Sequence, residues 1–409
     1  ALYNDVKPLL ATRLLSQPAP DIKREILVCG DTGCPRWYVK LSNEATIDIR
    51  KTKLDELMTK LTDQTLAYLK MQAAAGVDAI QLFDTWGGIL HPADYAKVVL
   101  PCVKRIMDGL ADAGVPRMSA FGKRSTAEEV TAGIDLAGRT ALVTGCNSGL
   151  GLETMRVLAM RGAHVIGAAR TQEKAEDACA SVEGRTTPLA IELTDLPGIV
   201  AAADEVAAMD TPLDMLILNA GIMQLPELQL VHGVERQFAV NHVGHFLLTM
   251  RLLEQVVAAD AGRVVVVSSG AHRWAPEGIR FDNLDGSQDY DPREAYGVSK
   301  TANGLFSREL ARRLAGTGAT SNSLHPGVIP TNLARHLPDR DYDMSNPFFK
   351  TIPEGSATQC YVATHPDLGG VTGWYFDDCN PALPNEHMQD DAAAAKLWAL
   401  SEELVADYL

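Results

Sequence analysis

Tyr296 and Lys300 lie four residues apart in the segment Tyr-Gly-Val-Ser-Lys. Side chains with this spacing are neighbours on the surface of a helix. An ammonium held beside a phenol favours the phenolate and lowers the phenol pKa, so such a pair could exchange a proton near neutral pH. The same spacing also arises on an ordinary solvated helix face, and the pair alone does not separate these two interpretations.

A glycine-rich loop, Thr144–Gly151, follows a short apolar segment and precedes a helical pattern. Glycines at such a place permit a tight turn and the close approach of a diphosphate to the helix N-terminus. The strand-loop-helix context favours nucleotide binding over a simple turn. The next apolar segment ends at Arg170, and an arginine there suits a ribose 2′-phosphate, whereas an acid would hold a 2′-hydroxyl. We therefore expect NADP(H) in preference to NAD(H).

The composition limits the classes of partner. A length of 409 residues predicts two or three domains, and a net charge of -15 without a basic cluster argues against a nucleic-acid partner. No apolar run reaches the length of a membrane span, and the first residues lack the features of a secretory signal. The seven cysteines lack metal-ligand spacing. These observations predict a cytoplasmic protein without a metal site; the resemblance described below implies a small-molecule substrate, and a homo-oligomer stays open.

Short apolar segments alternate with helical patterns from residue 140 onward, which predicts a parallel sheet covered by helices on both faces. Just before them, Ser125–Glu128 has the pattern of a capping box that opens a short helix. The fold class expected is α/β, a doubly wound parallel sheet of the Rossmann type. The predicted strands are Ala141–Thr144, His164–Ala168, Leu189–Leu193, Met215–Leu218, Arg263–Ser268, Thr320–Leu324 and Gly373–Phe376.

The order of these motifs resembles the short-chain dehydrogenase/reductase family, over about residues 118–409. Residues 121–128 and 295–303 are most similar to the retinol-dehydrogenase-like and WW-domain-oxidoreductase-like members. The resemblance implies an oxidoreductase that interconverts an alcohol with an aldehyde or ketone. The motifs that carry it are Thr144–Gly151, Asn219–Gly221, Asn241, Ser268-Ser269, Tyr296–Lys300 and Pro326-Gly327.

The resemblance also implies a role for each catalytic residue. Tyr296 would be the general acid/base, and Lys300 would lower its pKa and hydrogen-bond the nicotinamide ribose. Ser269, in preference to Ser268, would polarise the carbonyl. Asn241 would hold a water that links Lys300 to solvent. These four catalytic assignments are Asn241, Ser269, Tyr296 and Lys300.

The cofactor contacts implied in the same way extend along the whole domain. Leu193 would contact the adenine, although Glu192 stands where the family more often has aspartate. Residues 333–353 occupy the place of a substrate lid, whose apolar face Met344, Phe348 and Phe349 would form unless they belong to the core. The expected cofactor residues are Gly145, Asn147, Ser148, Gly149, Leu150, Gly151, Arg170, Leu193, Asn219, Ala220, Gly221, Tyr296, Lys300, Pro326, Gly327 and Thr331.

Residues 1–117 carry a second resemblance, to a middle segment of uroporphyrinogen decarboxylase, a TIM-barrel family. It rests on residues 72–88, which contain a predicted strand over Val77–Phe83, and on His91–Tyr95. Only part of a barrel would be present, so we expect an incomplete TIM-barrel-like α/β fragment that ends at a seam near Met118. The alternative function is thus a tetrapyrrole decarboxylase or a bifunctional fusion. A third candidate, an NADP(H) sensor without turnover, would not need the Ser-Tyr-Lys set.

Overall fold

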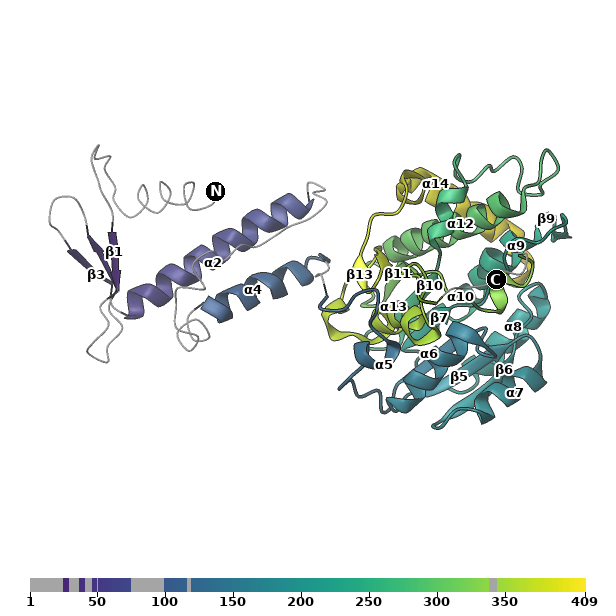
Figure 1. Cartoon of the computed structure of the whole chain (residues 1–409), viewed down its shortest axis with the longest axis horizontal. Coiled ribbons are helices and arrows are strands. Elements are labelled where there is room, and N and C mark those ends of the chain that lie inside the picture. Colours follow the sequence, from purple (N-terminus) through teal and green to yellow (C-terminus); the bar gives the residue numbers. More distant parts are fainter. Residues whose placement is uncertain are drawn as a thin grey trace. The chain divides into compact units, whose positions relative to one another are not determined.

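The structure is a computed structural model that describes residues 25–28, 37–40, 46–49, 51–74, 99–115, 119–337 and 344–409. The chain divides into two compact units, Ala1–Leu110 and Ala111–Leu409 (Figure 1). The predicted seam at Met118 and the predicted strand Val77–Phe83 lie outside the described residues, so the division into 1–117 and 118–409 stays a prediction.

The described part of the first unit combines a small sheet with two helices. Strands β1 (Glu25–Val28), β2 (Trp37–Lys40) and β3 (Thr46–Ile49) form an antiparallel sheet. Helix α2 (Lys51–Ala74) is joined to α4 (Leu100–Ala111) by an ion pair of 2.6 Å between Asp63 and Arg105. A TIM barrel is built from parallel strands. These described elements therefore do not show the expected barrel fragment.

The second unit is built on an eight-stranded sheet with the order β13-β12-β11-β10-β7-β4-β5-β6. Neighbouring strands are parallel except for β13, which pairs antiparallel with β12. The chain leaves β4 in one direction through β5 and β6, and then resumes on the other side of β4 at β7. This reversal is the switch point of a doubly wound fold. The strands are β4 (Thr140–Thr144), β5 (His164–Ala169), β6 (Thr186–Ala190), β7 (Met215–Leu218), β10 (Arg263–Val267), β11 (Thr320–His325), β12 (Tyr375–Asp377) and β13 (Asn380–Pro381).

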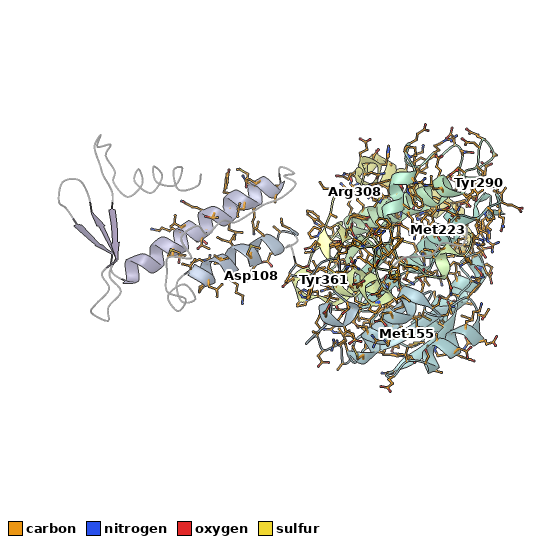
Figure 2. The ribbon with its side chains drawn as sticks, viewed as in Figure 1. Asp108, Met155, Met223, Tyr290, Arg308 and Tyr361 are labelled. Carbon is orange, nitrogen blue, oxygen red and sulfur yellow. The ribbon has the colours of Figure 1, made fainter. Side chains whose placement is uncertain are left out.

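Helices cover both faces of this sheet (Figure 1). Along β4, Leu142 packs in one hydrophobic cluster, whereas Ala141 and Val143 pack in the other, because successive strand residues point to opposite faces. Met155 and Tyr361, labelled in Figure 2, belong to helices on the second face. The first face is covered by α8 (Leu196–Ala207), α10 (Gly244–Arg251), α12 (Pro292–Arg313) and α14 (Asp391–Leu404), and the second by α5 (Ala127–Val130), α6 (Gly149–Met160), α7 (Gln172–Ala180) and α13 (Ile352–Thr364).

Short elements complete the unit. They are the hairpin β8 (Leu230–Val231) and β9 (Val234–Glu235), the helices α9 (Arg236–Phe238) and α11 (Leu253–Val257), the π-helix η3 (Ala239–Val243), and the 3₁₀ turns η4 (Gly270–Trp274), η5 (Asn332–Ala334), η6 (Pro366–Leu368), η7 (Glu386–Gln389) and η8 (Ala406–Tyr408). In the part of the chain that the structure describes, no helix combines the length and apolarity that a bilayer crossing requires.

The predicted doubly wound sheet is confirmed, with two local corrections. Strand β6 is Thr186–Ala190 instead of Leu189–Leu193, because it is an edge strand, where polar residues and Pro188 are tolerated. The capping box is shifted by one residue from the prediction. The Thr126 side chain caps α5, and the Glu129 side chain bonds back to the Thr126 N–H.

Candidate active site

The segments that follow β4, β5, β7, β10 and β11 share the carboxyl edge of the sheet, because these strands are parallel. They begin at Gly145, Arg170, Asn219, Ser268 and Pro326. Ligands of open α/β sheets bind at this edge, where the strand order reverses. The fold therefore gathers residues that the sequence singled out from distant positions along the chain.

Helix α12 brings the phenol and the ammonium to this edge. The Asp291 carboxylate caps its first turn by accepting two backbone N–H bonds. At Gly297 a Cβ atom would stand 2.9 Å from the carbonyl oxygen of Ala271, so glycine is needed for the helix to pack this closely on η4. Tyr296 and Lys300 are each only 3% exposed as a result.

Burial controls the proton affinity of both groups. It raises the pKa of the Tyr296 phenol, and a hydrogen bond with Ser269 offsets part of that rise. It lowers the pKa of the Lys300 ammonium to about 7. Lys300 Nζ lies 5.7 Å from the centroid of the Tyr296 ring. The expectation that Lys300 lowers the phenol pKa is therefore not met: desolvation dominates both groups, and Ser269 is the residue that lowers the phenol pKa.

The two adjacent serines after β10 have different partners. Ser268 is buried, and its hydroxyl donates to the carbonyl oxygen of Lys300 at 2.7 Å. Ser269 is half-buried, caps η4 by accepting from the Ala271 N–H at 3.1 Å, and lies close enough to Tyr296 to lower the pKa of the phenol. Ser268 thus fixes the helix, whereas Ser269 faces the phenol.

Asn241 lies in η3, a π-helical turn of the kind often found at functional sites. Its amide nitrogen donates to Ile222 O at 3.0 Å and to Ser299 Oγ at 2.9 Å, and its Oδ1 accepts from the Ile222 N–H at 2.9 Å. Ser299 in turn donates to Tyr296 O at 2.8 Å. The Asn241 side chain therefore ties the segment after β7 to α12, and its role in a water relay stays a prediction.

The glycine loop fits a dinucleotide in its local geometry. Gly145 has a φ of +70°, and a Cβ atom there would lie 2.9 Å from Ala220 Cα. A Cβ atom on Gly151 would collide with Gly145 O. Ser148 occupies the N-cap of α6 without a side-chain capping bond, so the side chain leaves the first-turn N–H groups to a ligand.

Comparison with known proteins identifies the family. The short chain dehydrogenase model matches residues 139–341. The chain is 44% identical over 303 residues to "Short-chain dehydrogenase TIC 32 B, chloroplastic" of Brassica napus, which covers 70% of this chain and 95% of that protein. The chain belongs to the short-chain dehydrogenase family. Human retinol dehydrogenase 14 is 40% identical over 292 residues, 66% of this chain and 86% of that protein. The crystal structure of a putative uncharacterized protein from Mycobacterium Paratuberculosis covers 68% of this chain and 97% of its own, with 35% identity and a TM-score of 0.56.

These relatives, together with WW domain-containing oxidoreductases, confirm the narrower resemblance drawn from the sequence. A second family model, for uroporphyrinogen decarboxylase, matches residues 46–155. That match extends through β4 and the glycine loop, and so overlaps the dehydrogenase unit.

Two expected cofactor contacts of the dehydrogenase differ in their surroundings. Arg170 is exposed at the end of β5, and its Nε lies 3.7 Å from Glu192 Oε2. Leu193 is only 6% exposed and packs against Gly244 of α10. Leu193 thus contributes to the core beneath the site, and its contact with adenine stays a prediction.

The Pro326-Gly327 turn of the dehydrogenase is held by a buried lysine. Lys350 Nζ donates to Pro326 O at 3.1 Å and forms an ion pair of 2.6 Å with Asp378. Gly327 has a φ of +106°, and a Cβ atom there would stand 2.5 Å from Lys350 Cδ. The predicted lid residues Met344 and Phe348 are exposed, so they do not belong to the core.

Sequence reasoning missed a buried network behind the site. His245 Nδ1 lies 3.0 Å from Asn241 O, a pure acceptor, so Nδ1 carries the proton and Nε2 accepts from Thr144 Oγ1 at 2.9 Å. Thr144 Oγ1 also accepts from the N–H groups of Asn219 and Ala220 at 2.9 and 3.0 Å. Burial lowers the pKa of His245 to about 4, so the imidazole is neutral at pH 7. The four-residue spacing of Asn241 and His245 was the available signal.

His325 is a second residue that the sequence reasoning passed over, although it directly precedes Pro326. Its Nδ1 accepts from the Gly270 N–H at 2.9 Å, so the proton of the neutral ring is on Nε2. Burial lowers its pKa to about 3. The ring thus fixes the peptide that follows Ser269, and with it the orientation of the Ser269 hydroxyl.

Replacing His325 with alanine should lower kcat by about tenfold to a hundredfold, because it leaves the Gly270 N–H without its acceptor and loosens Ser269. NADPH affinity should stay within about twofold. Asparagine at the same position offers a carbonyl acceptor and should recover part of the rate. Parallel measurements of kcat, KM and cofactor affinity check this; a fall in cofactor affinity with unchanged kcat would contradict the positioning role.

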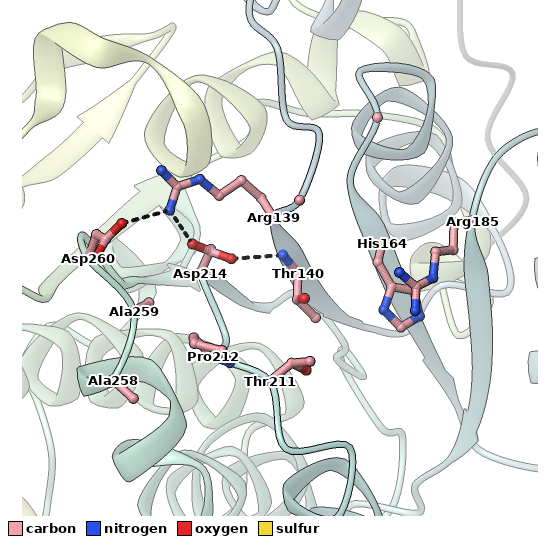
Figure 3. Close-up of a pocket in the computed structure, with 12 residues that line it drawn as sticks. Arg139, Thr140, His164, Arg185, Thr211, Pro212, Asp214, Ala258, Ala259 and Asp260 are labelled. Carbon is pink, nitrogen blue, oxygen red and sulfur yellow. Dashed lines mark hydrogen bonds and ion pairs between the residues drawn. The ribbon is translucent and has the colours of Figure 1, made fainter.

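A hollow of about 340 Å³ lies at the opposite, amino edge of the sheet (Figure 3). Three of its charged groups are paired with each other: Arg139 Nη1 lies 2.8 Å from Asp214 Oδ1 and 3.7 Å from Asp260 Oδ2. Asp214 also accepts from the Thr140 N–H at 2.8 Å. The contacts of Asp214 therefore hold the beginnings of the strands together. The hollow lies apart from the Ser269, Tyr296 and Lys300 group.

Proposed function

We propose that the chain is an NADP(H)-dependent oxidoreductase that interconverts an alcohol and an aldehyde or ketone, with Tyr296 as general acid/base. The observation that carries the proposal is that Ser269 and Lys300 lie beside the Tyr296 phenol at the sheet edge that also bears the glycine loop. A cytoplasmic location stays a prediction, as does the oligomeric state.

The glycine loop and the open first turn of α6 would hold the diphosphate of the cofactor. The residues Asn147, Ser148, Gly149 and Leu150 surround this turn. When bound, NADPH supplies the hydride that reduces the carbonyl carbon, or NADP⁺ accepts it in the reverse direction. What the protein itself adds is orientation and a proton at the carbonyl oxygen.

The catalytic side chains divide this work. The Ser269 hydroxyl donates to the substrate oxygen and fixes its position. The Tyr296 phenol, kept protonated at neutral pH by burial, gives its proton to that oxygen during reduction and removes the alcohol proton during oxidation. Lys300, anchored on Val267 O at 2.9 Å beside the phenol, would hydrogen-bond the nicotinamide ribose and so hold the cofactor next to Tyr296.

A screen of aldehydes, ketones and alcohols by NADPH absorbance tests the proposal directly. We expect carbonyl reduction near neutral pH and alcohol oxidation that rises with pH, because oxidation needs the phenolate of a tyrosine whose pKa is raised. Failure of the full chain to turn over any carbonyl, with NADPH bound, would remove the catalytic assignment.

Replacing Arg170 with alanine should weaken the binding of NADPH by about tenfold or more. The affinity for NADH should change by less than about twofold, because only NADPH carries the 2′-phosphate. Fluorescence titration of both cofactors gives the ratio. Arg185→Ala is a matched control, since Arg185 is exposed just before β6 at the opposite edge of the sheet. Equal losses for the two cofactors would argue against the 2′-phosphate role.

The uroporphyrinogen decarboxylase likeness supports no separate activity at present. The matched residues 46–155 run into β4 and the glycine loop, which the dehydrogenase unit uses. We therefore propose a single activity, carried by the second unit.

A further inference from the structure

The 3₁₀ turn η5 lies over the glycine loop. The methyl carbon of Thr331 would be 3.4 Å from a Cβ atom built on Gly149, so the start of this turn covers the diphosphate cradle. Thr331 also caps η5 by accepting from the Leu333 N–H at 3.4 Å. The position of the turn is thus set by contacts at its first residue.

Arg335 stands at the end of the same turn, and its side chain folds back along it. Its Nη1 donates to the carbonyl oxygen of Asn332 at 3.1 Å. Within the described parts of the chain, Arg335 forms no ion pair with a carboxylate, although the chain has a net charge of -15. The exposed guanidinium is therefore held in place with its charge uncompensated.

Arg170 is close enough to act on Arg335 electrostatically. The partial burial of its side chain lowers the pKa of Arg335, and the positive charge of Arg170 lowers it further. The carboxylate nearest to Arg170 belongs to Glu192, and at 3.7 Å it is beyond hydrogen-bond distance of Nε. Two like charges that face one site are unfavourable alone, and a dianion between them reverses the sign of this interaction.

The residues flanking η5 therefore connect two places: Thr331 lies beside Gly149 of the glycine loop, and Arg335 lies within electrostatic reach of Arg170. A dinucleotide bound to this fold extends in the same way, from its diphosphate at the glycine loop to its adenosine ribose at the end of the second strand. The dianionic group at that end of NADP(H) is the 2′-phosphate, where NAD(H) carries a neutral hydroxyl. We propose that Arg335 is a second specificity-determining residue, which holds the adenosine 2′-phosphate against Arg170 from the side of η5. This inference rests on the proposed use of NADP(H).

Calorimetry with 2′-phospho-ADP-ribose and ADP-ribose tests the inference without any turnover. Arg335→Ala should weaken the binding of 2′-phospho-ADP-ribose about tenfold to a hundredfold, because one charge-assisted contact is lost. The affinity for ADP-ribose should change by less than about twofold. Arg335→Lys should recover part of the loss, since it keeps the charge without the planar fork. Arg251→Ala, which removes one positive charge from the ion pair with Asp204, is the matched control and should leave the affinities for both ligands unchanged.

Two results would overturn the inference. If the wild-type chain prefers 2′-phospho-ADP-ribose and Arg335→Ala keeps that preference, Arg335 has no role, whereas the proposed cofactor preference survives. If the wild-type chain binds both ligands equally, the preference for NADP(H) fails and the role of Arg335 fails with it. Carbonyl turnover, measured separately, tests the catalytic assignment alone.

Discussion

Replacing Tyr296 with phenylalanine should reduce carbonyl turnover by about 10³-fold or more while NADPH affinity stays within about twofold. The change removes the proton donor and leaves the ring, which is 3% exposed, in its packing beside Trp274. General acid/base catalysis is worth about 10²–10⁴-fold, so the loss should be easily measured. Initial rates from NADPH absorbance and a fluorescence titration of NADPH give the two quantities.

Tyr290→Phe is the matched control for this experiment. Tyr290, labelled in Figure 2, donates its hydroxyl to Leu225 O at 2.7 Å, and the variant removes the same atom outside the Ser269, Tyr296 and Lys300 group. Its turnover should stay near that of the wild type. Tyr296→Phe with more than about a tenth of wild-type turnover would refute the assignment of Tyr296 as the acid/base.

Replacing Lys300 with methionine should separate activity from stability, lowering turnover by about a hundredfold or more while raising the free energy of unfolding at pH 7. Burial lowers the pKa of Lys300 to about 7 from an ordinary value of 10.5. A buried charge of this kind opposes folding, and methionine fills a similar volume without it. The carbonyl oxygen of Val267, which accepts from Lys300, keeps a second donor in Asn303 at 3.1 Å.

The gain in the free energy of unfolding that Lys300→Met brings should become smaller as the pH rises. Below pH 7 the folded and unfolded chains both carry the Lys300 proton, and the cost of burying the charge is fully present. As the pH rises from about 7 toward 10.5, the folded chain has released the proton and the cost disappears. Each pKa unit corresponds to about 1.4 kcal/mol, so a gain of roughly 2–4 kcal/mol is expected at pH 7 and a smaller one at pH 9.5.

Urea unfolding of the wild type and of Lys300→Met at these two pH values checks the stability effect. Lys174→Met, on the exposed face of α7, controls for the loss of one surface charge and should shift neither rate nor stability appreciably. A destabilised Lys300→Met at pH 7 would show that the ammonium contributes to folding. An unchanged rate would remove Lys300 from the catalytic group.

The parts of the fold that depend on local patterns could be predicted from the sequence. The uninterrupted apolar run of β4 indicates a strand buried on both faces, and the glycine loop after it locates the switch point. Strand β6 was misplaced because an edge strand need not be apolar, so Thr186 and Pro188 gave no signal. The family and its doubly wound sheet were predicted correctly because the ordered motifs lie at local turns, which the sequence specifies directly.

The parts of the site that depend on contacts between distant residues could not be predicted. Thr144 meets His245 across 101 residues, and Gly270 meets His325 across 55. Each contact requires the register of parallel strands, which a single sequence does not specify. The prediction that the pKa of Tyr296 is lowered was wrong for a related reason. The helical spacing indicated a nearby ammonium but gave no measure of how deeply both groups are buried.

The Thr144–His245 contact also has a consequence for how this protein can change over generations. Loss of the Thr144 hydroxyl would leave the N–H groups of Asn219 and Ala220 and the imidazole of His245 without their shared partner at once. A tolerated change at one position would therefore require a compensating change at the other. We therefore expect residues 144 and 245 to change together, which links the glycine loop to the helix turn that carries Asn241.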